Sequence, residues 1–400
     1  MTAFGRKRPL NSTVIAVSER PLSGKADVQP GTPKIGLSSG RFTLNSGHSG
    51  GRVLRGRKRP KPDGRFMECF RLKKQHNGAT MLIVRILSAA AILILFAYGA
   101  SAQTVPSENA WASEWGPDDE RGAANRITPQ KVLEATRLIK EGRIYELGRV
   151  YEAGMPLFPG RYYSLTIPGS PTGGPFGKNN LVYHDEIVSG QIGQVGTQFD
   201  GLGHVGTRIN GEDIFYNGFK RSEFGTAVGL DRLGVENVGV FVTRGVLIDM
   251  AGYKGVDRLP VGTVITATDL QDALEQQSIE LSEGDVVLIH TGHGLLWMVD
   301  NDEYNRGAPG IGVEAALWLA EKRVAMTGAD TWPVEVIPSE DPELAFPVHQ
   351  ELIARRGIYN LENLNLSELA ADKVYEFAFM FAPVKFKGAT GSPGNPIAIR

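Results

Sequence analysis

Apolar residues fall in short runs and in helical repeats along residues 103–400, and the two patterns predict different elements. Uninterrupted apolar runs near residues 238–250, in DVVLIHTG from residue 285 and in RVAMTGAD from residue 323 predict strands that are buried on both faces. The segment KVYEFAFMFAPVKF, residues 373–386, alternates apolar with other residues over much of its length, which predicts a long strand with two different faces.

Helices are predicted where an N-cap residue precedes a periodic apolar pattern. Thr128 and Pro129 supply an N-cap and a first-turn proline, and Gly142 supplies a stop, so a helix is expected through Lys140. Further helices are expected over residues 268–277, 313–322 and 347–355. Strands and helices mix without a regular βαβ rhythm. We therefore expect the α/β class, with one mixed-sheet domain over residues 103–400.

Two more strands are expected at residues 144–154 and 181–190, on either side of a loop rich in glycine and proline. Loops of this composition turn the chain at the surface and often carry binding residues. We therefore expect the loop, residues 168–180, to border a polar pocket.

The pocket itself is predicted at residues 193–206, GQVGTQFDGLGHVG. Gln194, Gln198, Asp200 and His204 have even spacings and would share one face of an extended strand. A straight strand would spread them over roughly 33 Å, too far for one metal ion with ligand bonds of about 2 Å. The intervening glycines accept the backbone angles of a bend, so the four side chains are expected to converge.

The amino-acid composition before residue 103 differs from that of the rest of the chain. Residues 1–80 hold 17 Lys and Arg against 4 Asp and Glu, so this segment is expected to be a disordered or upstream extension. Without residues 1–102 the chain keeps 25 basic and 40 acidic residues, a net charge near −15, which disfavours nucleic acid as a partner. The only cysteine, Cys69, lies in the extension, so the rest of the chain has neither disulfides nor thiolate ligands.

Residues 81–102, MLIVRILSAAAILILFAYGASA, have the features of a secretory signal peptide: one Arg, an apolar run and Ala-x-Ala before Gln103. Cleavage after Ala102 predicts an exported protein, periplasmic or secreted, with no membrane segment left. A retained membrane anchor is the alternative. The position of the segment suggests translation from Met67 or Met81.

The residue order of the pocket segment resembles a known signature. The motif His-x-Gly-Thr-His-x-Asp-x-Pro-x-His marks the cyclase or kynurenine formamidase-like family of metal-dependent hydrolases. Residues 194–204 read Gln-Val-Gly-Thr-Gln-Phe-Asp-Gly-Leu-Gly-His. The two glutamines in place of histidines resemble the branch that contains the zinc-dependent trans-dienelactone hydrolase. Blocks that resemble the family also lie at residues 115–129, 328–338, 349–366 and 388–399.

The resemblance implies a fold, a site and an assembly. The fold would be a single mixed-sheet domain of the swivelling β/β/α type. His349 and Glu362 would belong to the metal site, and His204 would act as general base and acid. The assembly would be a homodimer or homotetramer.

The residue types support a metal site independently. A catalytic metal needs a few protein ligands and an open position. Gln194, Gln198 and Asp200 offer oxygen ligands, and His349 and Glu362, which the resemblance adds, would either bind the ion or support the residues that bind it. Amide oxygens are weaker and harder ligands than imidazoles, so we expect a divalent ion, Zn²⁺ or Mn²⁺ first, with Mg²⁺ open. The alternative is that the glutamines only form hydrogen bonds in a protein that has lost its metal.

Proton transfer and substrate contact require further residues. The ordinary pKa of histidine lies near neutrality, so His204 suits proton transfer between an attacking water and the leaving atom. Thr197, with the amides of the glycine loop, is a candidate to stabilise an oxyanion. His290, Asp330 and Trp332 are candidates for substrate contact, with a structural role as the alternative.

The sequence therefore predicts an exported, metal-dependent hydrolase that opens a small cyclic ester, with a dienelactone-like lactone as the leading substrate. One alternative is hydrolysis of a cyclic amide or aryl formamide, of the isatin hydrolase or kynurenine formamidase type. A periplasmic binding protein without catalysis is the other.

Overall fold

The computed structural model describes residues 111–400. The predicted extension, residues 1–80, and the predicted signal peptide, residues 81–102, lie outside the described residues. Within residues 111–400, none of the helices has the length and apolar character needed to cross a membrane.

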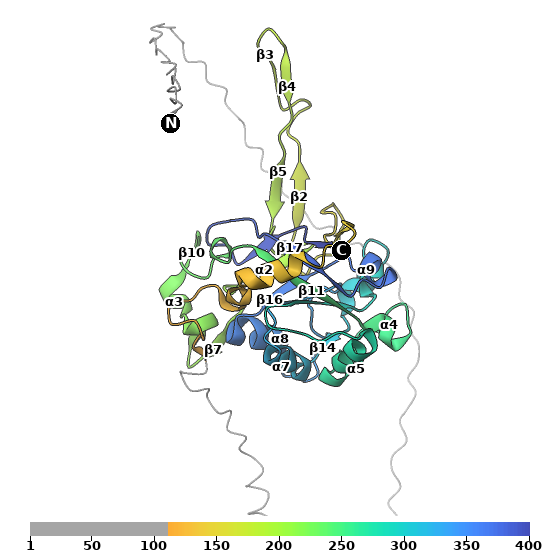
Figure 1. Ribbon diagram of the computed structural model, residues 1–400. Coiled ribbons are helices and arrows are strands. Elements are labelled where there is room, and N and C mark those ends of the chain that lie inside the picture. Colours follow the sequence, from red (N-terminus) through yellow and green to blue (C-terminus); the bar gives the residue numbers. More distant parts are fainter. Residues whose placement is uncertain (1–110) are drawn as a thin grey trace, which may run out of the picture. The chain divides into compact units, whose positions relative to one another are not determined.

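A nine-stranded mixed sheet forms the centre of the fold (Figure 1), which confirms the predicted α/β class. Its strands are, in spatial order, β1 (Ile144–Glu146), β19 (Ile397–Ile399), β17 (Glu376–Phe381), β11 (Phe241–Asp249), β13 (Val286–His290), β15 (Met326–Ala329), β16 (Tyr359–Glu362), β6 (Gln198–Asp200) and β18 (Gly391–Pro393). Strands β11, β13, β15 and β16 run parallel, and every other pairing in the sheet is antiparallel. The carboxyl ends of the four parallel strands therefore meet at one edge, where α/β sheets place their ligands.

Apolar side chains cover both faces of this sheet, because successive residues of each buried strand alternate between two clusters. In β13, Val287 and Ile289 pack with α5 (Ala267–Gln277) and α7 (Val313–Glu321), whereas Val286 and Leu288 pack in the cluster on the other face. The uninterrupted apolar runs in the sequence reflect this burial on two faces.

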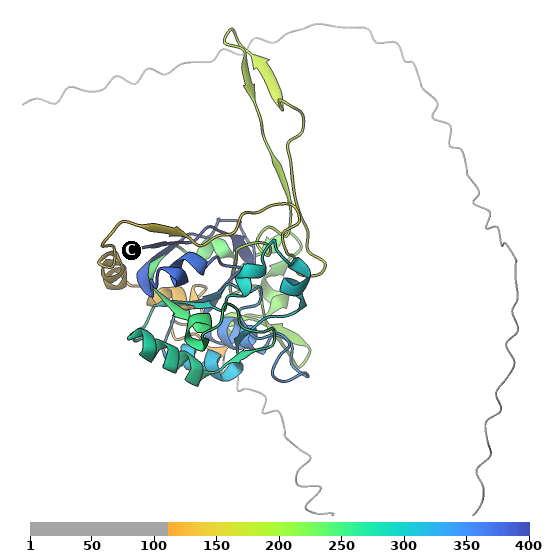
Figure 2. The same cartoon turned by 90° about the vertical axis from the view of Figure 1, so that its right-hand side faces the viewer.

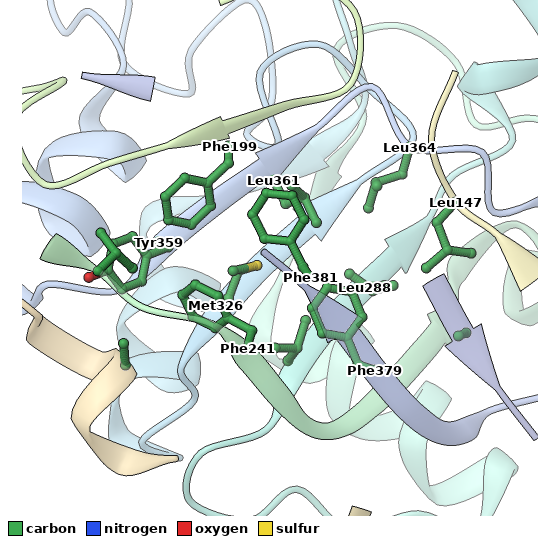
Figure 3. Packing of buried hydrophobic residues seen from close by; sticks show 14 of the residues in the cluster. Leu147, Phe199, Phe241, Leu288, Met326, Tyr359, Leu361, Leu364, Phe379 and Phe381 are labelled. Carbon is green, nitrogen blue, oxygen red and sulfur yellow. The ribbon is translucent and has the colours of Figure 1, made fainter. Parts of the chain in front are cut away.

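The second cluster contains a group of aromatic rings around Phe199 (Figure 3). The ring of Phe199 lies 4.9 Å from Tyr359, 5.6 Å from Phe241 and 5.4 Å from Phe381, measured between centroids. Phe199 is the middle residue of β6, so its burial turns the side chains of both its neighbours, Gln198 and Asp200, to the opposite face. The apolar core thereby fixes the direction of two polar site residues.

The remaining elements are short. The helices are α2 (Pro129–Thr136), α3 (Arg221–Phe224), α4 (Met250–Lys254), α6 (Asn301–Arg306), α8 (Pro347–His349) and α9 (Ser367–Ala371). Single turns are η2 (Gly122–Arg126), η3 (Tyr216–Gly218), η4 (Val235–Asn237), η5 (His293–Leu296) and the π-helical η6 (Gln350–Ala354). Strand pairs outside the main sheet are β7 (Thr207–Ile209) with β8 (Glu212–Ile214), β9 (Gly225–Thr226) with β10 (Gly229–Leu230), and β12 (Val264–Ile265) with β14 (Gly310–Ile311).

The predicted helix bounds differ from the structure at the end of α2 and at the start of α5. The hydroxyl of Thr128 accepts a hydrogen bond from the Lys131 amide at 3.2 Å, which confirms it as the N-cap of α2. The helix ends at Thr136 rather than Lys140, in a series of turns. Helix α5 starts before the predicted Thr268, because Thr266 forms a capping box that the prediction did not use.

A two-stranded arm projects from the body of the fold (Figures 1 and 2). Its base pairs β2 (Tyr163–Thr166) with β5 (Ile187–Gly190), and its tip pairs β3 (Gly173–Phe176) with β4 (Leu181–Tyr183). The predicted glycine and proline-rich loop and the predicted strand at residues 181–190 both belong to this arm.

Candidate metal centre

Three buried side chains converge at one end of the sheet. Suitable ligand atoms of Asp200, His349 and Glu362 all lie within 4.8 Å of one another. His349 Nε2 lies 3.1 Å from Glu362 Oε1 and 3.6 Å from Asp200 Oδ2. No other group of three His, Cys, Asp or Glu side chains within residues 111–400 meets the same spacing.

Strand pairing accounts for how these side chains meet. Strand β6 lies between β16 and β18, and Gln198 is directly opposite Glu362 in the antiparallel register. Opposed residues in such a pair present their side chains on the same face. Two segments far apart in the sequence thereby contribute one cluster of polar groups. His349 comes from a third segment of the chain, at the end of α8.

The predicted bend before β6 is present. Gly196 has a φ of 60°, and a side chain at this position would meet the ring of Tyr151 at 2.8 Å. Glycine is therefore required both for the backbone angle and for the space. The bend places Gln194 beside Asp200, with Gln194 Nε2 donating to Asp200 Oδ1 at 3.3 Å.

Glu335 is a site residue that the sequence reasoning missed. It accepts from His349 Nδ1 at 2.5 Å and from the His349 backbone amide at 3.0 Å. With Nδ1 engaged, Nε2 is the nitrogen that faces Asp200 and Glu362. Glu335 thus orients the imidazole in the way that carboxylates orient metal-binding histidines.

Both glutamines of the motif contact the carboxylates through their amide nitrogens. Gln198 Nε2 donates to Glu362 Oε2 at 2.6 Å, and Gln194 Nε2 donates to Asp200 Oδ1. In this arrangement the glutamines orient the carboxylates. Their role as metal ligands stays a prediction.

The donor set fits a divalent cation. Asp200 Oδ2 and Gln194 Oε1 are buried and have no hydrogen-bond partner among residues 111–400. Leaving buried acceptors without a partner costs free energy that a cation at this position would offset. Two carboxylates and one imidazole also suit Zn²⁺ and Mn²⁺ in chemical type.

Burial is the largest influence on the pKa values of the cluster, and the neighbouring charges act against it or add to it. Burial, together with the negative charge of Asp200, raises the pKa of Glu362 to about 7. Burial alone would lower the pKa of His349, but the nearby carboxylates of Asp200, Glu335 and Glu362 raise that pKa well above the ordinary value. The cluster therefore requires positive charge, from a proton or from a metal ion.

His204 lies beside the trio but outside it. Its Nε2 is 3.9 Å from Asp200 Oδ1, and 22% of its side chain is exposed. Burial lowers its pKa in spite of the nearby Asp200 carboxylate. The imidazole is therefore neutral near pH 7 and available to accept a proton.

A cavity of about 300 Å³ opens onto the site. It is lined by Gln198, Asp200, His204, His349 and Glu362, and by the aromatic residues Phe158, Trp332 and Phe346 with Arg161 and Gln350. The three aromatic rings contact one another, with centroids 5.4 to 6.4 Å apart. Trp332 is therefore placed on the cavity, as expected. Phe158 and Arg161 were not predicted, because they lie far from the motif in the sequence.

Three candidates for substrate contact do not line this cavity. Thr197 is buried, and its hydroxyl donates to the Asn363 carbonyl at 2.9 Å and accepts from the Arg149 amide at 2.8 Å. Its hydrogen bonds therefore anchor the loop.

The expectation that residues 168–180 border the pocket is wrong, because they form the tip of the arm.

His290 and Asp330 form a separate polar cluster with Asp249. His290 Nδ1 lies 2.7 Å from Asp249 Oδ1, and its Nε2 lies 3.9 Å from Asp330 Oδ2. Asp330 also accepts hydrogen bonds from the amide and hydroxyl of Thr291. These contacts join the carboxyl ends of β11, β13 and β15, which is a structural role.

The chain is similar to known proteins in sequence and in fold. Residues 145–336 match the family model named Cyclase. The crystal structure of a protein described as a novel cyclase shares 35% identity, covers 72% of this chain and 96% of its own, and gives a TM-score of 0.65. No curated protein matches the chain.

Two isatin hydrolases give weaker matches. Isatin hydrolase A from Ralstonia solanacearum shares 24% identity, covering 64% of this chain and 92% of its own, with a TM-score of 0.47. Isatin hydrolase A from Labrenzia aggregata shares 20% identity, covering 64% of this chain and 93% of its own, with a TM-score of 0.44. These values are too low to transfer a substrate.

Replacing Glu335 by Gln should weaken metal binding without removing a residue of the trio. The variant loses the charge that orients His349, so we expect the Kd for Zn²⁺ to rise by about ten- to a hundredfold. Competition with a chromophoric chelator measures this change, and circular dichroism checks the fold. Glu343→Gln, on the same loop but exposed, is the matched control. Equal Zn²⁺ affinity in both variants would contradict the role of Glu335.

The Asp249–His290 pair should stabilise the fold mainly at acidic to neutral pH. Burial would lower the pKa of His290, but its bond to Asp249 raises it, so folding favours the protonated imidazole. Its contribution is complete below the unfolded pKa of about 6.5 and is lost as the pH rises through the folded pKa. Above about pH 4, Asp249 is charged in both states.

We therefore expect Asp249→Asn to lower the Tm more at about pH 5.5 than at about pH 8.5. Asn keeps the N-cap that Asp249 provides to α4, so the comparison isolates the charge. Thermal melts at the two pH values measure the effect, with exposed Asp257→Asn as the control. A larger loss at the alkaline pH would refute the pairing.

Proposed function

The chain belongs to the cyclase family, and from this premise we propose that it is a metal-dependent hydrolase that opens a cyclic ester or a cyclic amide. The observation that carries the proposal is the buried trio of Asp200, His349 and Glu362, which faces a cavity with His204 at its side. A dienelactone-like lactone remains the leading substrate class, on the resemblance of the Gln-x-x-x-Gln-x-Asp motif. A cyclic amide is the alternative.

The trio would hold the divalent ion, with Zn²⁺ and Mn²⁺ as the first candidates. When bound, such an ion lowers the pKa of water and polarises a carbonyl group. Glu335 holds the imidazole of His349, and the two glutamines hold the two carboxylates, so the ligand atoms are preorganised.

His204 would transfer the proton in this reaction. Its neutral imidazole accepts a proton at Nε2 from the attacking water and returns it to the leaving oxygen or nitrogen. The same bond between carbonyl carbon and ring heteroatom breaks in both substrate classes. His204 would thus serve both in the addition of water and in the collapse of the tetrahedral intermediate.

The cavity walls indicate the shape and charge of the substrate. Phe158, Trp332 and Phe346 present aromatic surfaces, which suit a small planar ring. Ring opening by water also produces a carboxylate. Arg161 lines the cavity, and among the described residues it forms no ion pair with an Asp or Glu. Its guanidinium is therefore available to bind an anionic group.

Metal loss and His204 loss should have separable effects. We expect chelation to abolish turnover of a panel of lactones and cyclic amides, and Zn²⁺ or Mn²⁺ to restore it. His204→Ala should keep about one metal ion per chain yet lose turnover by at least about a hundredfold. Asp200→Ala should lose both. His184→Ala, an exposed histidine of the arm, is the control.

Elemental analysis and steady-state rates on the same preparations separate these cases. Full metal occupancy in Asp200→Ala would refute its role as a ligand. Ligand-dependent melting with no metal and no turnover would favour the binding protein instead.

Arg161 should set the affinity for the ring-opened product. We expect Arg161→Gln to weaken competitive inhibition by the product carboxylate by about tenfold or more, since a hydrogen bond to a charged group is lost. Arg161→Lys keeps the charge and a donor for the Gln194 carbonyl, so its inhibition constant should change less. Inhibition constants measured against the best lactone test this. Unchanged inhibition in Arg161→Gln would contradict the assignment.

A further inference from the structure

Asn363 follows the candidate ligand Glu362 directly, and its backbone turns the chain away from the sheet. Its φ is 57°, in the left-handed region, and only 6% of the residue is exposed. Residues other than glycine adopt this conformation rarely, although asparagine does so more readily than most. A buried residue keeps it only where the surrounding contacts hold it in place. The contacts of Asn363 must therefore hold the turn.

Every polar atom of Asn363 forms a hydrogen bond. Its backbone amide donates to the Thr331 carbonyl at 2.9 Å, and its backbone carbonyl accepts from the Thr197 hydroxyl at 2.9 Å. Its side-chain Nδ2 donates to the Gly196 carbonyl at 2.8 Å, and its Oδ1 accepts from the Tyr304 hydroxyl at 2.7 Å. Asn363 thus joins the pocket segment to α6 and to the loop after β15.

Two of these bonds replace the end of a strand ladder. Gln198 opposite Glu362 is the last pair of β6 with β16. The next residues along the two strands are Thr197 and Asn363. Regular pairing cannot continue there, because Gly196 and Asn363 both have left-handed backbone. Instead, the Thr197 hydroxyl donates to the Asn363 carbonyl, and the Asn363 side-chain amide donates to the Gly196 carbonyl. The two strands are therefore held together beside the candidate metal ligands.

Tyr304 fixes the orientation of the Asn363 amide. The phenol is fully buried, and its ring stacks on His293 at 4.9 Å and meets Trp297 edge to face at 5.5 Å, measured between centroids. A phenol carries a proton to donate at neutral pH, so Oδ1 is the amide atom that faces it. Nδ2 must then face the Gly196 carbonyl. The packed ring thereby maintains the bond that closes the strand pair.

Neither Asn363 nor Tyr304 lines the cavity, so neither residue contacts a bound substrate there. Both act on the site through the strands that carry Asp200 and Glu362. The distance between these two carboxylates decides whether one ion can bind to both. A residue that sets this distance therefore acts on metal affinity and metal geometry, and substrate affinity should change less.

We propose that Asn363 is a positioning residue of the metal centre, which holds the pocket segment against the end of β16 with Tyr304 as its support. The inference rests on the proposed function only in that it requires a metal ion at the trio. Loss of Asn363 would loosen the strands beside the carboxylates, whereas loss of Glu335 would free the imidazole of His349. Two different contacts thus orient two different parts of the same trio.

The test removes the Asn363 side chain without removing the turn. Glycine adopts left-handed backbone freely, so Asn363→Gly loses the two side-chain bonds and keeps the backbone conformation. Asn210→Gly is the matched control, because Asn210 has a φ of 51° but is exposed in the turn between β7 and β8. The control also carries the flexibility that glycine adds to the unfolded chain. Tyr304→Phe is a milder second variant, which loses one hydroxyl and keeps the ring.

Metal affinity and metal geometry are measured on the full chain. Competition with a chromophoric chelator gives the Kd for Zn²⁺, and the visible absorption spectrum of the Co²⁺-loaded protein reports the ligand geometry. Thermal melts of the metal-free proteins measure stability separately. Turnover of the panel of lactones and cyclic amides gives kcat and KM.

We expect Asn363→Gly to raise the Kd for Zn²⁺ by about ten- to a hundredfold and to shift the Co²⁺ spectrum, since contacts that orient metal ligands contribute that much. Tyr304→Phe should raise the Kd by about two- to tenfold, the effect of one hydrogen bond. Asn210→Gly should leave both the Kd and the spectrum unchanged. In Asn363→Gly, kcat should fall more than KM rises.

A lower Tm with an unchanged Kd and spectrum in Asn363→Gly would show a purely structural role and overturn the inference. If Asn363→Gly does not fold, Tyr304→Phe decides by the same two readouts. An equal rise of the Kd in Asn210→Gly would also overturn the inference. A wild type without metal affinity would overturn both this inference and the proposed function. A wild type that binds metal but turns over no member of the panel would count against the proposed function alone, because the Kd and the spectrum require no substrate.

Discussion

The repulsion between two buried carboxylates is the constraint on which this structure depends. Asp200 and Glu362 are buried on neighbouring strands, and burial together with the negative charge of Asp200 raises the pKa of Glu362. The fold surrounds them with donors: Gln194 and Gln198 on one side and His349 on the other. The buried carboxylates require a positive charge beside them, from a proton or from a metal ion. Cation binding and the stability of the fold are therefore coupled.

The core supplies the rigidity that this arrangement needs. Strand β6 is only three residues long, yet it is hydrogen-bonded on both sides and held by the aromatic cluster around Phe199. A lone three-residue strand would not fix the direction of Asp200. Because Phe199 cannot leave the core without a large loss of packing, its neighbours cannot rotate away from the cavity.

Part of this arrangement was predictable from the sequence. The buried strands and the helix that Thr128 caps follow from local patterns, because burial on two faces and capping leave traces in consecutive residues. The pocket segment was predictable from its glycines, with Asp200 and His204 correctly brought together. His349 and Glu362 came from the resemblance and meet Asp200 as expected.

Other parts depend on contacts that no local pattern records. Glu335 appears in the sequence as a lone carboxylate in the apolar run Pro-Val-Glu-Val, and that isolation was the one indication of a buried partner. Phe158 and Arg161 reach the cavity from a connecting segment, so only the tertiary fold reveals them. Thr197 sits inside the motif, but its hydroxyl holds the loop.

The pairing of Tyr163 with Gly190 at the root of the arm means that the chain leaves and re-enters the body at adjacent points. The arm is therefore an insertion into the body of the fold, and its two ends lie next to each other. The entropy of closing such a loop grows only slowly with its length. Relatives could thus lengthen, shorten or lose the arm while the sheet and the carboxylate site stay in register.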